Sequence, residues 1–191
     1  MTVSEQKTGD ASSSEKRSRV LALTVTGLMA AVICVLGPLS IPLPGDLVPV
    51  SLGALGVFLA SVILGWKKGV IAVLIYLLIG FVGLPVFAGF TAGAGKLFGP
   101  TGGYLIGYIP TVLIAGFFAD RFRGKKIMML LGIVLGTAVL YVIGSFWLSW
   151  QAGMSIGAAF MAGCVPFIPA DLVKAFIAVF LGDAISRAIR K

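Results

Sequence analysis

The strongest constraint on the fold is a run of 44 residues, 127–170, that contains no Asp, Glu, Lys or Arg. A transmembrane helix needs about 20 consecutive apolar residues, so this run is longer than one crossing of a bilayer. The whole chain is 59% hydrophobic and 12% charged, whereas an average soluble domain has about 25% charged residues. We therefore expect an integral membrane protein built from helices, because lipid cannot satisfy free backbone N–H and C=O groups.

Six transmembrane helices account for the apolar runs. We expect them at residues 20–36, 50–66, 69–83, 101–119, 127–150 and 168–190. Residues 151–170 contain several glycines and prolines, which indicates a short helix or a re-entrant segment. Residues 1–19 carry seven charges, so we expect a disordered cytoplasmic tail. The predicted fold is an all-α integral membrane protein with one six-helix bundle over residues 20–191.

Two segments between these helices are too rich in glycine or proline to be helical. Residues 38–49 hold four prolines and are expected to form an outer loop. Residues 83–108 hold eight glycines and two prolines, yet they are apolar enough to lie at membrane depth. Broken backbone survives at that depth only where protein buries it or where it lines a cavity. This outer segment is therefore expected to take part in a binding site.

The lysines and arginines predict the orientation of the bundle. Thirteen of the fifteen lie in the tail, between the second and third helices, between the fourth and fifth, or after the sixth. Basic residues concentrate on the cytoplasmic side of membrane proteins. We expect a multi-pass protein of the cell membrane with both termini in the cytoplasm. The two exceptions, Lys96 and Lys174, map to the outer half.

Four charges mark the outer half: Asp46, Lys96, Asp171 and Lys174. Asp171 and Lys174 are three residues apart on one helix and share a face. They form either a local ion pair that closes the helix start or a ligand site, and the charge-poor surroundings favour the site. Lys96 either extends to the outer surface or contacts a ligand. Asp46 lies in the proline-rich loop, where solvation is the simpler interpretation.

Several other classes of function fit the sequence poorly. Gly95-Lys96 resembles part of a phosphate-binding loop, but Phe90 and Leu97 replace the required glycine and Ser/Thr. With no histidine and seven acidic residues, a conventional metal centre is not expected. The basic residues flank apolar spans and form no soluble face for nucleic acid. We expect no enzyme activity and no cofactor, and any energy source must come from other chains.

Aromatic and small residues give two further hypotheses. Aromatic side chains gather at the outer end as belt anchors or as the lining of an amphipathic pocket, and the site candidates among them are Phe87, Phe90 and Tyr104. On the first helix, small residues follow one another at helical spacing and either pack internally or dock a partner. These small residues are Ala22, Thr26 and Ala30, with Gly27 and Ala31 beside them.

Three sequence blocks resemble the BioY family, the biotin-specific S component of energy-coupling factor (ECF) transporters. They are G-L-P-V-F-A-G at 83–89, G-P-T-G-G-Y-L-I-G-Y at 99–108 and P-F-I-P-A-D-L-V-K at 166–174. The resemblance covers residues 20–190 and implies a six-helix bundle that binds biotin near the outer face. It further implies a transmembrane coupling protein and two ATPase subunits as partners. The family's Asp and Lys fall on Asp171 and Lys174, and the small stripe of the first helix resembles the surface that meets the coupling protein.

The chemistry of biotin fits these residues. A lysine suits its carboxylate, aromatic side chains suit its apolar middle, and an aspartate suits the two N–H groups of its ureido head. Asp171 and Lys174 can hold the head with Lys96 at the tail, or the assignment is reversed. Two alternatives are an S component for another vitamin and a non-transport membrane protein.

Overall fold

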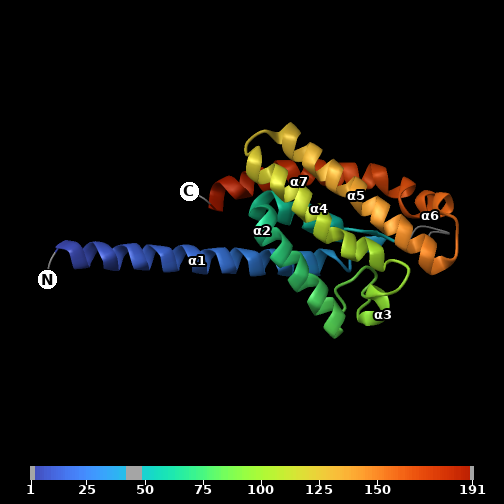
Figure 1. Ribbon diagram of the computed structural model, residues 1–191, viewed down its shortest axis with the longest axis horizontal. Coiled ribbons are helices and arrows are strands. Elements are labelled where there is room, and N and C mark those ends of the chain that lie inside the picture. The colour runs from blue at the N-terminus through green and yellow to red at the C-terminus, as the bar shows by residue number, and fades with distance from the viewer. Residues whose placement is uncertain (1–2, 42–48, 190–191) are drawn as a thin grey trace.

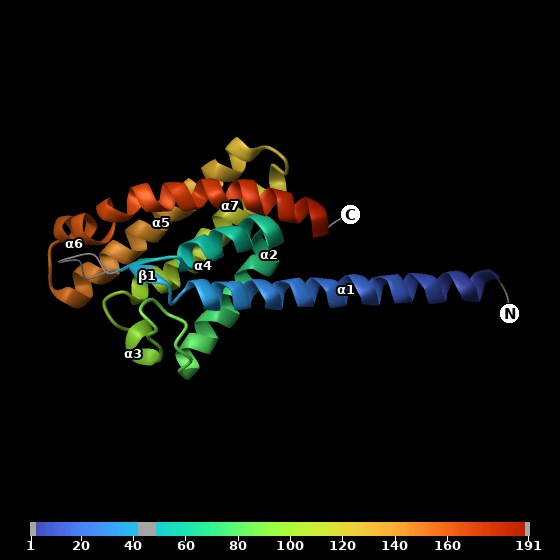
Figure 2. The same ribbon diagram turned by 180° about the vertical axis from the view of Figure 1, so that it is seen from behind.

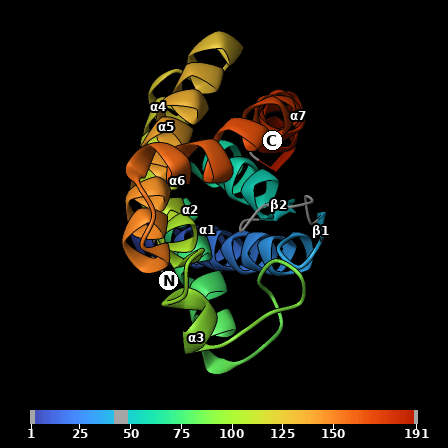
Figure 3. The same ribbon diagram turned by 90° about the vertical axis from the view of Figure 1, so that its right-hand side faces the viewer.

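The computed structural model describes the backbone of residues 3–41 and 49–189 and nearly all side chains from Arg19 onward in these ranges. Helices α1, α2, α4, α5 and α7 form an elongated bundle, with α2 packed between α1 and α7 and α4 packed between α2 and α5 (Figures 1 and 3). Five helical segments are long and apolar enough to cross a membrane. The elements in chain order are α1 (Val3–Leu36), β1 (Ser40–Ile41), β2 (Val50–Ser51), α2 (Gly53–Val82), α3 (Ala94–Leu97), α4 (Gly102–Arg121), α5 (Lys126–Ala152), α6 (Ile156–Gly163), the 3-10 turn η1 (Val165–Phe167) and α7 (Ile168–Ile189).

Helix α1 begins at Val3 rather than near residue 20. Its apolar part, Arg19–Leu36, has a mean hydropathy of 2.2, and the preceding part extends away from the bundle as a continuous helix (Figures 1 and 2). The structure therefore differs from the expected disordered tail. Residues 10–26 contain neither glycine nor proline, so nothing in the sequence stops the helix at the membrane boundary. The domain boundary at residue 20 stays a prediction.

Helix α2 contains both the second and the third predicted helices. Gly65 has φ 75° and ψ −173°, which is outside the helical region, and the chain turns there. The second half of α2 then runs back toward the end from which the first half came (Figures 1 and 2). An added Cβ at Gly65 would lie 2.2 Å from Oδ2 of Asp120, so glycine is required by space as well as by conformation. With the two halves counted separately, α1, α2, α4, α5 and α7 provide the six predicted helices.

Close packing of α4 against α5 depends on glycine. An added Cβ at Gly144 would lie 2.3 Å from the Tyr104 ring, and one at Gly136 would lie 2.8 Å from the backbone oxygen of Thr111. The hydroxyl of Thr111 donates to the backbone oxygens of Gly107 at 2.8 Å and of Gly136 at 3.1 Å. The helices thus approach backbone to backbone, which is the internal-packing role expected of small residues in membrane helices.

The broken segments gather at one end of the bundle (Figure 2). Strands β1 and β2 pair antiparallel, with Ser40 opposite Ser51, and the tip of this loop, including Asp46, lies outside the described residues. Between α2 and α4 the only described helix is the four-residue α3, which confirms the predicted interruption. Residues 151–170 contain the short helix α6 followed by η1, so the short-helix interpretation is correct.

The opposite end of the bundle carries the described basic segments. The Gly65 turn, the connection between α4 and α5 and the end of α7 all lie there (Figure 1), and Lys67, Lys68 and Arg123 line one cavity at this end. These described basic segments therefore share one end, as the sequence predicted, and Lys96 and Lys174 are the two exceptions. That this end faces the cytoplasm stays a prediction.

Candidate functional site

The first turns of α7 hold a buried ion pair. Asp171 and Lys174 are only 8% and 6% exposed. The ammonium of Lys174 donates to Oδ1 of Asp171 at 2.8 Å. The local pair predicted from the i,i+3 spacing is present, but it lies inside the bundle rather than at a solvated helix start. Two buried charges are stable only when further hydrogen bonds satisfy their remaining donors and acceptors.

Two residues from other elements supply those hydrogen bonds. The hydroxyl of Tyr141, on α5, donates to Oδ2 of Asp171 at 2.8 Å. The ammonium of Lys174 donates to the backbone oxygen of Ser51, in β2, at 2.7 Å. The Ser51 hydroxyl in turn donates to the backbone oxygen of Gly37 at 2.7 Å. The network therefore joins α7, α5 and the outer hairpin. Sequence reasoning missed Tyr141 and Ser51, because neither residue carries a charge.

Two small cavities lie next to this network. One, of about 60 Å³, borders Asp171 and Lys174. The other, of about 50 Å³, borders Lys96 and Phe87. The cavities share four lining residues, so they are neighbours within one site: Pro49, Ser51, Tyr104 and Tyr108. Lys96 therefore lies at the same site as the ion pair. The interpretation of Lys96 as a ligand contact requires this position.

Several polar groups around the cavities have no partner. The hydroxyl oxygens of Thr101 and Tyr104 are buried without a hydrogen bond in the described part of the chain. The Tyr104 hydroxyl lies beside Ser145 and Cys164, whose side chains hydrogen-bond to each other at 3.0 Å. Lys96 is half-buried and makes no hydrogen bond or ion pair with a described residue. Buried polar groups are nearly always paired, so these atoms are available to a polar ligand.

The two predicted phenylalanines have different environments. Phe87 is fully buried and its ring meets Tyr76 edge to face, with centroids 5.5 Å apart. Phe90 is 66% exposed with φ 57° and lines neither small cavity, so its role as a site residue stays a prediction. Phe87 and Thr91 exchange backbone hydrogen bonds around residues 88–90. Closing so short a loop requires a left-handed residue, and the resulting turn directs the Phe90 side chain outward.

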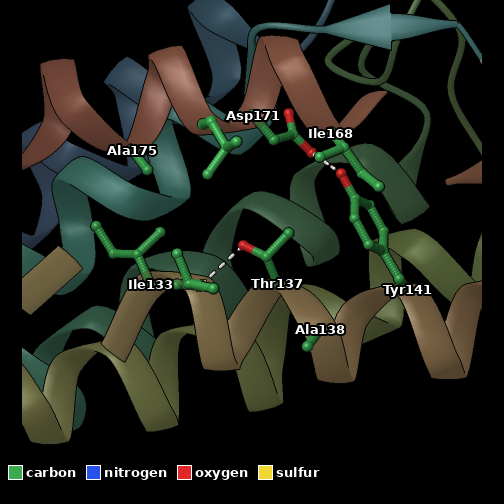
Figure 4. Close-up of a pocket in the computed structure, with 9 residues that line it drawn as sticks. Ile133, Thr137, Ala138, Tyr141, Ile168, Asp171 and Ala175 are labelled. Carbon is green, nitrogen blue, oxygen red and sulfur yellow. Dashed lines mark hydrogen bonds between the residues drawn. The ribbon is translucent and has the colours of Figure 1, made fainter. Parts of the chain in front are cut away.

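A third cavity, of about 200 Å³, lies between α5 and α7 (Figure 4). Asp171 and Tyr141 meet at one end of it, and the hydroxyl of Thr137 donates to the backbone oxygen of Ile133 at 2.8 Å. Its rim residues Val134 and Leu172 are 39% and 43% exposed, so this groove opens to the outside of the bundle. The groove is otherwise apolar and has no cation in its lining, so it is poorly suited to an anionic ligand.

The predicted partner stripe on α1 divides into two groups. Thr26 and Ala30 are 5% and 2% exposed, and Ala22 is half-buried. Helix α1 packs on α2, so this part of the stripe serves internal packing, which corrects the prediction for Thr26 and Ala30. Gly27 and Ala31 are exposed, and an added Cβ at Gly27 would meet nothing within 4 Å. Of the five residues of the stripe, only Gly27 and Ala31 are exposed to a partner.

No metal centre is formed by the described residues, among which no group of three His, Cys, Asp or Glu side chains lies together. The arrangement has instead a buried carboxylate held between a tyrosine and a lysine, an aromatic middle and a second lysine that has no partner among the described residues. The chemistry of these groups suits an amphipathic molecule with polar groups at both ends.

Comparison with known proteins supports one family. The BioY family model matches residues 8–191. The biotin transporter BioY2 of Lactococcus lactis subsp. cremoris is 34% identical over 174 residues, which cover 91% of this chain and 94% of that protein. The probable biotin transporter BioY of Pyrococcus horikoshii is 42% identical over 136 residues, covering 71% and 79% of the two chains.

A solved structure gives the same result for the fold. The crystal structure of the S-component for biotin from an ECF-type ABC transporter has a TM-score of 0.84 and 32% sequence identity, covering 90% of this chain and 93% of that chain. The agreement of the family model, of the relatives and of this structure extends over nearly the whole bundle. The chain therefore belongs to the BioY family.

Proposed function

We propose that this chain is the biotin-binding S component of an ECF-type importer. The observation that carries the proposal is the pair of adjoining cavities with the Asp171–Lys174 pair at one side and Lys96 at the other. The two ends of this site have the polar groups that the two ends of biotin require. The relatives named as biotin transporters support the ligand.

The burial of the charges favours one orientation of biotin. Asp171 is buried, so a second carboxylate beside it would be repelled in a medium of low dielectric constant. The neutral ureido head avoids this repulsion, since its N–H groups donate to Asp171 and its carbonyl accepts from Lys174. Lys96 is half-buried and unpaired among described residues, which suits the carboxylate tail. The apolar middle then lies against Phe87, Tyr104 and Tyr108.

Binding also requires a change in the site. The two cavities measure about 60 and 50 Å³, whereas sites for small molecules usually measure about 300–1,000 Å³. Tyr104 and Tyr108 belong to the shared lining, so their movement would merge the cavities. The Thr101 hydroxyl, which is buried in the lining of the second cavity without a hydrogen bond in the described part of the chain, then gains a partner.

We infer the partners from the family and from α1. A transmembrane coupling protein and two ATPases supply the energy, because this sequence has no complete phosphate-binding loop. The exposed Gly27 and Ala31 form the face of α1 that we assign to the coupling protein. Both termini are assigned to the cytoplasm, where ATP is available to the partner subunits.

Mass spectrometry of small molecules bound to the purified chain tests this function. We expect biotin from the growth medium, and we expect titration calorimetry in detergent to give tight binding of biotin but not of thiamine or riboflavin. Tight binding of another vitamin would overturn the ligand. A folded protein that binds none of them would favour a membrane protein without a transport role.

A further inference from the structure

A cavity of about 630 Å³ lies at the basic end of the bundle, opposite the proposed biotin site. Its walls come from α1, from the turn in α2, from the end of α4 and from the end of α7. Gly65 and Asp120 build the turn, since Oδ2 of Asp120 accepts a hydrogen bond of 3.1 Å from the Trp66 backbone N–H. This hydrogen bond holds Trp66 and the two lysines that follow it at the cavity.

The polar side of the cavity has an excess of positive charge. Three basic residues, Lys67, Lys68 and Arg123, and one acidic residue, Asp120, line it. Asp120 already accepts hydrogen bonds from Arg123 and from the Trp66 N–H. The Lys67 ammonium lies 5.2 Å from the Trp66 ring centroid, and Lys68 is exposed without a partner in the described part of the chain. Both ammonium groups are therefore available to an anion.

The other side of the cavity is apolar and exposed. Leu21 and Ile189 both line the cavity, and their exposed fractions are 51% and 37%. Trp66, 38% exposed, belongs to the residue type that concentrates at the level of lipid headgroups. A free anion would leave the apolar wall uncovered, and a neutral lipid would leave the lysines unpaired. A molecule with a net negative phosphate headgroup and attached hydrocarbon chains satisfies both.

We propose that this cavity binds an anionic phospholipid, with its phosphate between Lys67 and Lys68 and its chains along Leu21 and Ile189. Basic pockets between transmembrane helices suit phospholipid headgroups, and each lysine contributes on the order of a fivefold gain in affinity. Such a lipid fills the space between α1 and α7 and holds the α2 turn at the membrane surface. This site is separate from that proposed for biotin, and its test does not depend on biotin binding.

Native mass spectrometry of the full chain in detergent tests the proposal. We expect a one-to-one adduct with phosphatidylglycerol and little with phosphatidylcholine of the same chain length. Lys67→Gln with Lys68→Gln should weaken the phosphatidylglycerol adduct about thirtyfold. The matched control is Lys125→Gln with Lys126→Gln, an adjacent basic pair near the same end that does not line the cavity. Ser186→Trp, which fills the cavity without a change of charge, should also remove the adduct.

Four results would overturn the proposal. An equal loss of the phosphatidylglycerol adduct in the control variant would mean that the lipid binds to the basic surface in general and not to this cavity. Equal binding of phosphatidylcholine would remove the role of the lysines. Displacement by millimolar inorganic phosphate, with Ser186→Trp still binding lipid, would indicate an anion site without lipid recognition. If no lipid binds and the Lys67→Gln, Lys68→Gln variant instead loses co-purification with a coupling protein, the cavity is a protein-docking site.

Discussion

The ammonium of Lys174 on α7 donates a 2.7 Å hydrogen bond to the backbone oxygen of Ser51, which lies 123 residues earlier in the chain. The same ammonium donates a hydrogen bond of 2.8 Å to Oδ1 of Asp171. One cation therefore links the helix that carries the acidic site residue to the outer hairpin that lines both small cavities. A ligand that contacts Asp171 or Lys174 must change the bonding of that hairpin.

Replacement of the whole ion pair separates its structural role from its binding role. Lys174→Met leaves Asp171 buried without its cation, which should cost about 3–5 kcal/mol of stability and abolish biotin binding. The double variant Asp171→Leu, Lys174→Met should recover most of the melting temperature but no biotin binding, because apolar replacement of a buried pair is nearly neutral. Thermal unfolding in detergent and calorimetry measure both effects. A double variant that binds biotin normally would make the pair purely structural.

A milder change tests the acceptor itself. Asp171→Asn turns one oxygen acceptor into a donor, and the lost charged hydrogen bond is worth about 1.5–3 kcal/mol. Biotin affinity should therefore fall by about one to two decades. Asp183→Asn is the matched control, since Asp183 is also buried on α7 and paired, here with Arg187 at 2.7 Å. If both variants bind biotin as the parent does, Asp171 does not contact the ligand.

The assignment of Lys96 to the carboxylate tail predicts a selective loss. Lys96→Gln should weaken the binding of biotin by about tenfold or more, since an ion pair in a partly buried site is lost. The same variant should bind biotin amide as the parent does, because that analogue has no carboxylate. Calorimetry with both ligands gives the comparison. A loss for both ligands, or for neither, contradicts the proposed orientation.

The two faces of α1 predict opposite effects of the same substitution. Gly27→Trp adds a ring at an open, exposed position, so it should prevent association with the coupling protein and leave biotin affinity unchanged. Ala30→Trp adds the ring at a site only 2% exposed, so it should reduce the yield of folded protein and impair biotin binding. Val142→Trp, on the exposed face of α5, is the control and should change neither. If the Gly27→Trp variant co-purifies with the coupling protein as the parent does, this face of α1 is not the surface that meets the coupling protein.

The orientation of the bundle is tested by cysteine labelling. With Cys34 and Cys164 replaced by alanine, Ser12→Cys and Lys191→Cys should react with an impermeant reagent only after the membrane is permeabilised. Phe90→Cys, at the opposite end and 66% exposed in the parent, should react in intact cells. Labelling of Ser12→Cys or Lys191→Cys in intact cells would reverse the predicted topology.

The sequence alone determined the helices and the composition of the ends. Charge-free runs predicted the helical spans, and glycine with proline predicted the interruption between α2 and α4, because both effects act over short stretches of backbone. The pairing of Asp171 with Lys174 was also predictable, since their spacing places them on one helical face. The placement of the basic segments between the helices at one end was predictable too, because each pair of successive transmembrane helices returns the chain to the same side.

Only the tertiary structure decided which faces are buried and which distant residues meet. In a membrane helix the inner and outer faces are equally apolar, so hydropathy does not distinguish the buried Ala30 from the exposed Ala31. The outward turn of Phe90 depends on the backbone conformation of a short loop. Tyr141 and Ser51 join the site from 30 and 123 residues away. Their roles come from packing between helices, whose geometry depends on long-range contacts that no local pattern records.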